Sequence, residues 1–502
     1  MSIRANLRDG SYEWLAAILL SWWIPFQLFG EFHVQYWVSL LLWIVPIAFL
    51  LPRFLRETHR GSRRRQALLA SAGYIFIAGL ILDFAFGAAI LRFDKCPPGT
   101  AYLRCLRAIG GEIPIEEYLF YILGGLAVVL VYVWADMHWL SGYNVHQRQG
   151  LIPAPGHLIE LSPRVAIVAT LTLGAGIAWR VYYETLGPKT LQAWTRAIPF
   201  YYTFLVLFAF LPLILMYRAV MDFVNWRAFS LTGLYVLLTS AIWEITLGLP
   251  NCWWCYQDKA MIGKYIRAWS FKEQYPIEAL LVWIAVVFVG VFFYEFWETY
   301  FYDPRPPLQK LFTGTFPPSP PPPPPPVSIG ISVIARGSSD LDDRVRRLKP
   351  AMESGMLDHS AFEIVVSANT PEWRSAGAEL ARYPTLCFLD ATLTAAPRVF
   401  RMIRDVLESP RIVGGSTTVV FTGPIGARIR HLVQRPKAWI TAVDCGVAFC
   451  RRVDFEALTK TEQAADQDDF LRGLRRLGKE SRRVLTRLTT DGVTERTHPF
   501  ND

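Results

Sequence analysis

Long apolar runs constrain the fold of this chain more than any other feature. About eight of them lie in the first 300 residues, at 12–30, 34–52, 68–92, 116–134, 164–180, 197–217, 229–248 and 276–300. Each approaches the roughly 20 residues that an α-helix needs to cross a bilayer. The first run follows Arg4 and Arg8 and has no small-residue cleavage site, so we expect a retained helix rather than a signal peptide. The runs predict a multi-span α-helical membrane domain.

A cluster of arginines after the second run sets the expected orientation. It contains Arg53, Arg56, Arg60, Arg63, Arg64 and Arg65. Loops rich in arginine stay in the cytoplasm, so eight crossings predict that both termini are cytoplasmic in a multi-pass protein of the cell (inner) membrane. The net charge of +9 does not indicate nucleic acid as a partner, because the arginines do not form one basic face.

A proline–glutamate motif opens two of the predicted helices. Pro114, Glu116 and Glu117 stand at the start of the fourth run, and Pro276 and Glu278 stand at the start of the eighth. A carboxylate near hydrocarbon costs several kcal/mol, so its repeated use indicates a function. The structural alternative is that these glutamates stabilise helix starts, since a proline and an acidic first turn are typical there.

The two halves of the membrane region align beyond this motif. Asp83 falls on Glu244 and Glu116 falls on Glu278, at a nearly constant offset of about 161 residues. This pattern indicates a duplication, with repeats over residues 12–150 and 151–305. Because each predicted repeat crosses the membrane four times, the repeats are expected to be parallel, with functional groups between them. Ala279 takes the place of a second Glu117, so we expect an asymmetric site.

A proline run at residues 317–326 separates the membrane region from the rest of the chain. Such a run forms a stiff polyproline II spacer. We therefore predict a membrane domain over residues 1–305, a linker over 306–326 and a further domain over 327–502. Strands expected at 328–335, 363–367 and 387–390, with a helix at 341–353, predict that this further domain has an α/β sheet.

Four cysteines lie in two corresponding loops of the membrane region. Cys252 and Cys255 have the spacing of zinc or redox pairs, but two tryptophans stand between them and no second pair matches, which favours a packed aromatic hairpin. Cys96 and Cys105 could form a disulfide if their loop lies outside the cytoplasm.

The membrane region resembles the integral-membrane lycopene cyclases, the flavin-independent group found as heterodimers or fusions. The resemblance covers about residues 30–300 and rests on Pro-Ile-Glu-Glu at 114–117, its partial repeat at 276–278 and the aromatic loop 253–256. The chain departs from the family pattern at Ala279, and its first half lacks the aromatic loop. The resemblance implies an enzyme of carotenoid biosynthesis that cyclises the ψ end groups of lycopene or a related carotenoid. Its partners would be the apolar substrate, the bilayer and other carotenoid-pathway enzymes.

Such a cyclisation needs an acid, a base and a dry aromatic cavity, and it needs no redox cofactor and no metal. We expect Glu116 and Glu278 to act as acid and base, in an order that stays open, and Glu117, Asp83 and Glu244 to tune them. The expected substrate-binding residues are Pro114, Pro276, Phe120, Trp253, Trp254, Tyr256 and Trp283. The sequence contains no G-x-G-x-x-G motif for a dinucleotide.

Residues 327 to about 486 resemble the GT-A fold of family-two glycosyltransferases. The segments that carry this resemblance begin at Ile331, Glu363, Phe388, Gly446 and Phe470. The carboxylates expected of the family are depleted: Ser367 replaces the aspartate for the nucleobase, Asp390 is the only acid of the metal motif, and Asp466 precedes a glutamine. We expect a degenerate domain, with Asp390, Asp466 and Asp469 as its candidate site. A divalent metal and a nucleotide-sugar are expected only if it is active.

Two other functions fit the sequence. In the first, the protein is a membrane glycosyltransferase whose helices bind a carotenoid or polyprenyl acceptor. In the second, it is a non-catalytic carotenoid-binding scaffold. A retinal photoreceptor is excluded because none of the eight apolar runs contains a lysine.

Overall fold

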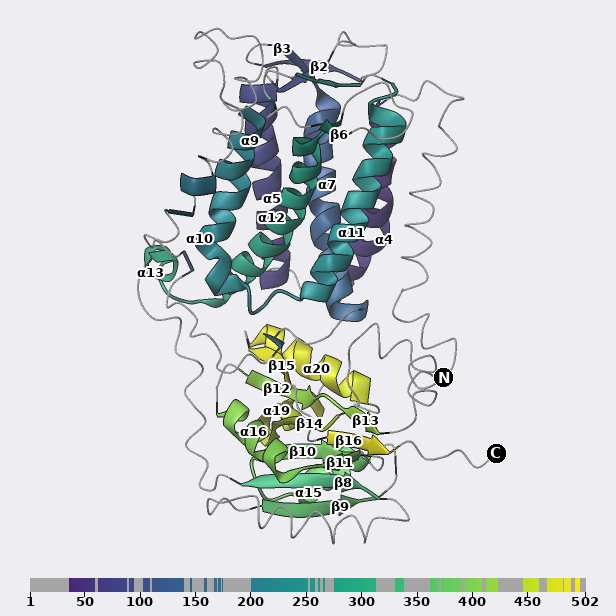
Figure 1. The fold of residues 1–502 in the computed structure, drawn as a ribbon, viewed down its shortest axis with the longest axis vertical. Coiled ribbons are helices and arrows are strands. Elements are labelled where there is room, and N and C mark those ends of the chain that lie inside the picture. The colour runs from purple at the N-terminus through teal and green to yellow at the C-terminus, as the bar shows by residue number, and fades with distance from the viewer. Residues whose placement is uncertain are drawn as a thin grey trace, which may run out of the picture. The chain divides into compact units, whose positions relative to one another are not determined.

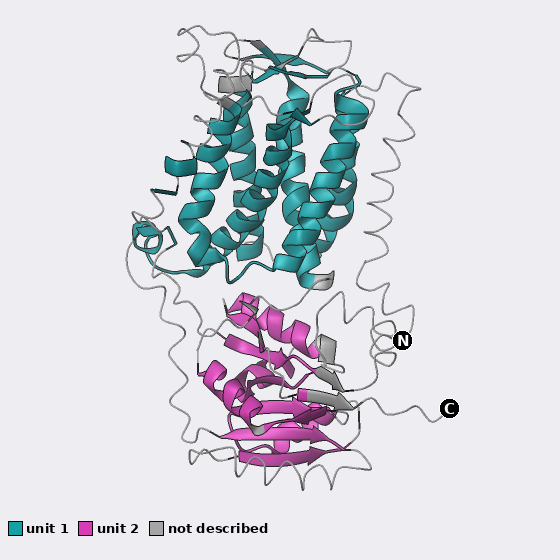
Figure 2. Ribbon diagram, viewed as in Figure 1, with its two compact units in different colours: residues 1–139, 155–315 teal, residues 140–154, 316–502 magenta. Residues whose placement is uncertain are grey.

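The computed structural model divides the chain into two compact units (Figure 2). Unit 1 comprises residues 1–139 and 155–315, and unit 2 comprises residues 140–154 and 316–502. The residues described are 36–58, 62–87, 90–93, 103–108, 111–139, 145–146, 158–159, 167–168, 170–172, 174, 200–251, 253–257, 261, 265–266, 275–312, 330–337, 362–368, 370, 372–390, 393–408, 412–422, 446–459, 467–481, 483–488 and 493–496.

Unit 1 is a bundle of helices (Figure 1). Its α-helices are α3 (Tyr36–Ser39), α4 (Leu41–Glu57), α5 (Arg63–Ile81), α7 (Ile115–Trp134), α9 (Phe200–Leu205), α10 (Leu211–Val220), α11 (Trp226–Trp243), α12 (Ile277–Tyr302) and α13 (Pro307–Phe312). Among the described residues, π-helical segments continue these helices at η1 (Leu82–Gly87), η2 (Ala135–Trp139), η4 (Val206–Phe210) and η5 (Glu244–Gly248). Such π segments often mark functional sites in helices.

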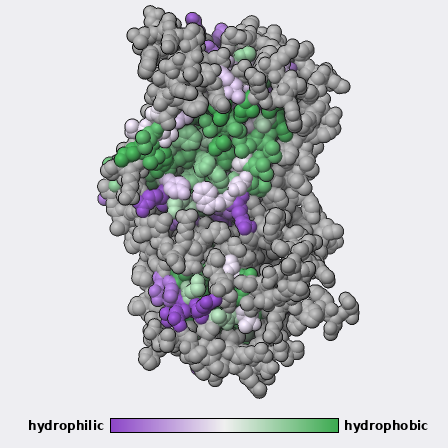
Figure 3. All heavy atoms as spheres, in the orientation of Figure 1, coloured by the Kyte–Doolittle hydropathy of each residue, from purple (hydrophilic) through white to green (hydrophobic). Residues whose placement is uncertain are grey.

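The described part of the chain contains 6 helices long and apolar enough to cross a membrane. They are Tyr36–Glu57, Arg63–Phe84, Ile115–Met137, Tyr201–Val220, Trp226–Gly248 and Ile277–Tyr302. Six of the predicted spans are therefore present. The run at 12–30 lies outside the described residues, and the run at 164–180 is described only at scattered positions, all of them helical. Figure 3 shows apolar side chains gathered over the helices of unit 1.

Polar side chains fix the ends of these helices. The Ser62 hydroxyl accepts a hydrogen bond from the N–H of Arg65 and caps the start of α5. The Asn225 side chain accepts from the N–H groups of Arg227 and Ala228 and caps α11. The N-cap positions of α7 and α12 are Pro114 and Pro276, which have extended backbone and no side-chain cap bond. These prolines define where the two helices begin.

Short strands connect the helices at the end of the bundle where α7 and α12 begin. β2 (Cys105–Ala108) and β3 (Gly111–Pro114) form an antiparallel hairpin, and β6 (Tyr265–Ile266) pairs in the same way with β7 (Tyr275–Pro276). β1 (Leu91–Arg92) pairs antiparallel with β5 (Cys255–Tyr256), which joins the first half of the bundle to the second. Each proline–glutamate motif therefore follows a hairpin.

Unit 2 is an α/β fold around a 7-stranded sheet of order β4-β15-β12-β14-β10-β8-β9. The strands of this sheet are β4 (Val145–His146), β8 (Ile331–Arg336), β9 (Phe362–Ser367), β10 (Thr385–Leu389), β12 (Ile412–Thr417), β14 (Ala448–Arg451) and β15 (Val484–Leu488). A second sheet contains β11 (Leu393–Ala395), β16 (Val493–Arg496) and β13 (Val420–Thr422). The helices are α15 (Trp373–Leu380), α16 (Pro397–Leu407), α19 (Arg452–Thr459) and α20 (Gln467–Glu480).

The predicted α/β sheet of unit 2 is confirmed, with strands at the three expected positions. β8 lies between β9 and β10 and is parallel to both. β4 was not predicted: it comes from the loop between the two halves of the membrane region and pairs with β15. α13 forms inside the segment expected to be linker. The helix expected at 341–353 and the proline run lie outside the described residues.

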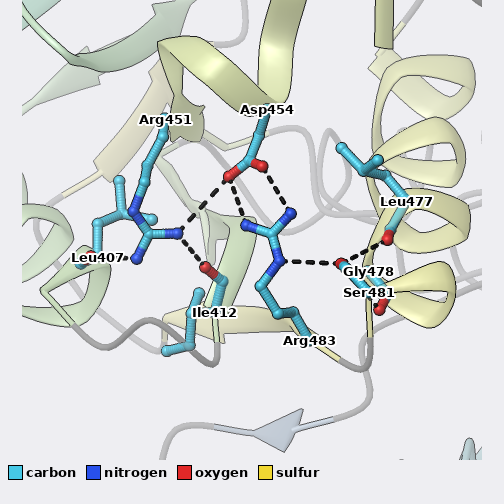
Figure 4. A network of polar contacts seen from close by, with 8 residues as sticks. All are labelled: Leu407, Ile412, Arg451, Asp454, Leu477, Gly478, Ser481 and Arg483. Atoms are coloured by element: carbon cyan, nitrogen blue, oxygen red, sulfur yellow. Dashed lines mark hydrogen bonds and ion pairs between the residues drawn. The ribbon is translucent and has the colours of Figure 1, made fainter. Parts of the chain in front are cut away.

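A buried ion-pair network ties β14, α19 and the start of β15 together (Figure 4). The Asp454 carboxylate accepts from the Arg483 guanidinium at 2.9 and 2.7 Å and lies 3.6 Å from Arg451. Arg451 also donates to the carbonyls of Leu407 and Ile412. Burial lowers the pKa of the Arg451 guanidinium, although the neighbouring Asp454 acts in the opposite direction. The Asp454 carboxylate is buried, both arginines are half-buried, and all three are paired, so we regard the network as structural.

Candidate functional site

Both proline–glutamate motifs place carboxylates in the first turn of a membrane-spanning helix. Glu116 and Glu117 lie at the start of α7, and Glu278 lies at the start of α12; all three are buried. Glu116 Oε1 accepts a hydrogen bond from the backbone N–H of Leu103. Leu103 lies outside the helix, in the chain that leads into it. The other Glu116 oxygen has no hydrogen-bond partner among the described residues. Glu116 therefore also anchors the preceding loop, a role that helix capping alone does not describe.

Two further carboxylates accept hydrogen bonds from aromatic side chains at matching positions of the two halves. The Tyr121 hydroxyl on α7 donates to Asp83 Oδ1 on η1 over 3.1 Å and a sequence separation of 38. The Trp283 indole N–H on α12 donates to Glu244 Oε1 on η5 over 2.7 Å and a separation of 39. Both acids lie in π-helical segments that continue α5 and α11. The two halves thus use the same arrangement of acid and aromatic donor.

Glu117 lies between the two groups. Its Oε1 accepts from the Tyr36 hydroxyl over 2.8 Å, and it is close enough to Asp83, Glu244 and Glu116 to interact with each electrostatically. Tyr201 is buried, and its hydroxyl is close enough to Glu244, Asp83, Glu278 and Glu117 to interact with each electrostatically. The five predicted carboxylates therefore converge at one end of the bundle.

Beside the carboxylates lies a layer of aromatic rings. Trp43 on α4 stacks on Trp283 at 5.7 Å with an interplanar angle of 13°. Phe120 lies 4.8 Å from Trp243, and Trp243 lies 5.3 Å from Trp254. We call Tyr36, Trp43, Phe120, Trp243, Trp253, Trp254 and Trp283 the aromatic layer. Its members come from both halves, and stacked π faces of this kind can stabilise a cation.

The aromatic layer includes four of the residues chosen from the sequence: Phe120, Trp253, Trp254 and Trp283. Sequence reasoning missed Tyr36, Trp43, Tyr121, Tyr201 and Trp243. Trp243 could have been found because it directly precedes Glu244. The others give no such signal, since a tyrosine or tryptophan in an apolar run looks the same on any face of a helix.

Tyr256 completes the surroundings of Glu244. Its hydroxyl donates to Glu244 Oε2 over 3.1 Å, while Trp283 occupies the other oxygen. Burial first, and then the neighbouring Glu244, raise the pKa of the Tyr256 hydroxyl well above its usual value. Tyr256 therefore stays protonated and can only donate to this carboxylate.

The cysteine loops differ in their chemistry. Cys255 on β5 is half-buried and is not part of a disulfide, and Cys252 lies outside the described residues. Cys105 on β2 is disulfide-bonded, and its partner is not among the described residues. Within the described ranges, no group of three or more His, Cys, Asp or Glu side chains is placed to hold a metal ion.

The candidate residues of unit 2 are only partly described. Asp390 follows β10, and its half-buried carboxylate lies 3.6 Å from the Arg336 guanidinium at the end of β8. The described residues do not fit a divalent metal at Asp390, because a cationic side chain stands beside this single carboxylate. Ser367 is buried at the end of β9, and its hydroxyl has no hydrogen-bond partner among the described residues. Asp466 lies outside the described residues; Asp469 lies in the first turn of α20, and its side chain is not described.

Comparisons with known proteins do not assign the chain to a family. No protein-family model matches it, and no curated protein sequence matches it. Among solved structures, the chain is similar to glucosyl-3-phosphoglycerate synthase from Mycobacterium tuberculosis in complex with Mn2+, UDP and glucosyl-3-phosphoglycerate. That match has 14% identity and a TM-score of 0.26, and covers 34% of this chain and 74% of that one.

Two further solved structures give matches of the same kind. The same enzyme with Mn2+, UDP and phosphoglyceric acid matches with 13% identity and a TM-score of 0.24, over 34% of this chain and 72% of that one. A structure described as a mycobacterial protein matches with 14% identity and a TM-score of 0.24, over 34% and 68%. Similarity at this level carries no argument about activity. The α/β fold of unit 2 follows from its own strand order.

Proposed function

We propose that unit 1 is an isomerase of carotenoid biosynthesis that cyclises the ψ end group of lycopene or a related linear carotenoid within the membrane. The observation that carries this proposal is the convergence of five buried carboxylates beside the aromatic layer. Asp83 accepts a hydrogen bond from Tyr121, and Glu244 accepts one from Trp283 at the matching position of the second half. Glu117 interacts electrostatically with both acids. A site rich in acids and aromatic rings at the end of an apolar bundle suits proton chemistry on an apolar molecule.

The reaction needs only proton transfers. A carboxylic acid gives a proton to the terminal alkene, and a cation forms at the neighbouring carbon. A second double bond attacks that carbon, so that a carbon–carbon bond closes the ring. A carboxylate then removes a proton from the ring and restores a double bond. The product is an isomer of the substrate, and no electrons are gained or lost, so this chemistry requires no cofactor.

The hydrogen bonds suggest different roles for the two halves. Both oxygens of Glu244 accept hydrogen bonds, from Trp283 and Tyr256, an arrangement suited to a carboxylate that takes up a proton. Asp83 has one oxygen bonded to Tyr121 and one without a partner among the described residues, which can carry the proton that is donated. We therefore assign the acid to the Asp83–Glu117 side and the base to Glu244, with Glu116 and Glu278 completing the site.

The matching features of the two halves support a duplication into parallel repeats. In both, a hairpin precedes the proline–glutamate motif, and a π-helical segment carries the acid that bonds an aromatic side chain. Ala279 stands where the first half has Glu117 and is buried at the same helix position. The asymmetry between the repeats gives the acid and the base different surroundings, as the division of roles requires.

Charge and redox chemistry support an orientation for the bundle. The arginine-rich turn between α4 and α5 lies at one end, which we assign to the cytoplasm together with unit 2. The disulfide-bonded Cys105 lies near the carboxylates at the other end. Disulfides persist outside the cytoplasm, so this assignment agrees with a site at the outer face of the cell membrane.

Expression in cells that accumulate lycopene tests the proposal. Chromatography of the pigments should show ring-bearing carotenoids, and the amount should fall in the Asp83→Asn and Glu244→Gln variants, which change the proposed acid and the proposed base. If the protein reaches the membrane in good yield and lycopene stays unconverted, the cyclase proposal is wrong. If cyclisation occurs but both variants keep full activity, only the site assignment is wrong. If the protein is only a carotenoid-binding scaffold, the pigment composition will be the same in cells with the unchanged protein and in cells with either variant.

A membrane glycosyltransferase remains the second candidate, and one observation favours it. Unit 2 has an α/β sheet in which Asp390 and Arg336 lie at the carboxyl ends of neighbouring parallel strands, where ligands of such sheets bind. Hydrolysis of a nucleotide-sugar or transfer of its sugar, lost in the Asp390→Asn variant, would establish this function. If the full-length protein neither hydrolyses a nucleotide-sugar nor transfers its sugar, the glycosyltransferase function is excluded.

A further inference from the structure

A hollow lies between α4 and α7 at the end of the bundle far from the carboxylates. It is partly open to its surroundings and is lined by Leu50, Arg53, Phe54, Glu57, Leu130, Val133, Trp134 and Met137. None of these residues belongs to the carboxylate site or to the aromatic layer. We propose that this hollow binds one anionic phospholipid, with its phosphate on Arg53 and the first part of an acyl chain on the apolar wall.

The sequence of α4 gives a local reason for the hollow. Pro52 lies inside the helix, directly before Arg53. A proline within a helix has no N–H to donate and crowds the carbonyl four residues earlier, which favours a bend at that point. The hollow lies beside this proline, since Leu50 and Arg53 line it.

The lining of the hollow changes from apolar to charged over a short distance. Leu50, Leu130 and Val133 are buried and form an apolar wall. At the mouth, Arg53 Nε lies 3.3 Å from Glu57 Oε1, and the two side chains are 19% and 40% exposed. An occupant must therefore combine an apolar part with a polar head.

The charges around the hollow favour an anionic head. Three neighbouring arginines already have structural contacts: Arg63 lies 4.7 Å above the Tyr302 ring, Arg64 is 3.8 Å from Glu298, and Arg65 donates to the carbonyls of Leu55 and Thr58. Arg53 is the arginine that lines the hollow. A guanidinium binds phosphate with two parallel hydrogen bonds, and basic pockets between helices are suited to anionic headgroups.

Lipid binding to the purified full-length protein tests this site. Native mass spectrometry or lipid-dependent thermal stability should show tighter binding of phosphatidylglycerol than of phosphatidylcholine with the same acyl chains. Loss of a hydrogen-bonded charge pair should weaken phosphatidylglycerol binding in the Arg53→Gln variant by about 10-fold or more. Glu57→Gln removes the carboxylate that competes with the lipid phosphate for Arg53, so phosphatidylglycerol should bind more tightly. A misfolded protein would not show such a gain in affinity.

Arg56→Gln is the matched control. Arg56 is exposed on the same turn of α4 and does not line the hollow. General attraction to a charged surface is worth about 1 kcal/mol per arginine, so this variant should lose no more than about 5-fold. Equal losses in the two arginine variants, or equal binding of both lipids, would overturn the site. Equal protection by inorganic phosphate alone would show a soluble-anion site and not a lipid site.

Discussion

At the level of single residues, Glu244 is the carboxylate with the most fully defined surroundings. Its two oxygens accept from Trp283 and Tyr256. Glu244→Gln keeps the size of the side chain but removes its ability to take up a proton. We expect cyclisation to fall by about 100-fold or more, because an acid–base residue contributes 10²–10⁴ in rate. The ratio of cyclic to linear pigment per amount of membrane protein measures this effect.

Glu112→Gln is the control for that substitution. Glu112 is exposed on β3, in the hairpin that leads to Glu116, so the same change of charge occurs near the site without entering it. Its pigment ratio should equal that of the unchanged protein. A similar loss in both variants would mean that surface charge, and not Glu244, controls the reaction.

The ion pairs of Asp454 lead to a prediction about the stability of unit 2. Asp454 is the shared carboxylate of two arginines, so Asp454→Asn would leave the half-buried Arg451 and Arg483 without their counter-charge. We expect a loss of about 3–5 kcal/mol in the free energy of unfolding, measured by denaturation of the purified protein with a probe in unit 2. Asp405→Asn removes an ion pair whose carboxylate is 56% exposed and should cost less than about 1 kcal/mol. Equal costs would contradict the structural role of the network.

At the level of elements, the packing of α5 against α7 controls the position of Tyr121. A Cβ at Gly79 would lie 2.3 Å from the Tyr121 ring, which is an impossible contact. Gly79→Ala should therefore push Tyr121 away from Asp83 and lower cyclisation, with an overpacking cost of about 1–3 kcal/mol. Pigment ratios and the thermal stability of the purified protein measure the two effects.

Gly73→Ala provides a comparison on the same helix. An added Cβ at Gly73 meets nothing within 4 Å, and alanine is the better helix former. This variant should keep both activity and stability. If Gly73→Ala and Gly79→Ala behave alike, the effect belongs to the glycine content of α5 and not to the Tyr121 contact.

Asp303 ends α12 and makes the end of this helix sensitive to acid. Burial alone would raise the pKa of Asp303, but the hydrogen bonds and charge of Arg305 outweigh it and hold the pKa below its ordinary value of 3.8. A lowered pKa stabilises the fold fully above the ordinary value, and this contribution disappears as the pH falls through the lowered one. The unchanged protein should therefore be more stable than Asp303→Asn near neutral pH, with a gap that closes below pH 3.8. Thermal unfolding at a series of pH values measures the gap, and a constant gap would contradict this account.

The elements show how far the sequence predicts the fold. Helix positions such as α7 and α12 followed from apolar length, because the bilayer sets that length. The Asp83–Tyr121 bond and the place of Trp43 in the aromatic layer did not follow, because they depend on how helices are rotated against each other. β4 is two residues long and exists only through its pairing with β15, so local sequence carries no signal for it. The carboxylates were predictable because charge in an apolar run is rare.

At the level of the whole molecule, the two units have independent interiors. The five carboxylates and the aromatic layer come from residues between Tyr36 and Trp283, all within unit 1. Unit 2 has its own core, which includes Phe388, Phe455 and Phe470. Each unit therefore has its own buried core, and we expect the proposed reaction to use side chains of unit 1 alone.

A chain that ends at Phe316 tests this separation. It keeps unit 1 and removes most of unit 2, so ring formation per amount of membrane protein should stay within about twofold of the full-length protein. β4 loses its partner β15 in this chain, and residues 140–154 should become a new site of protease cleavage. If the shortened protein inserts into the membrane but no longer forms rings, unit 2 takes part in the reaction, and the two units must be regarded as one enzyme.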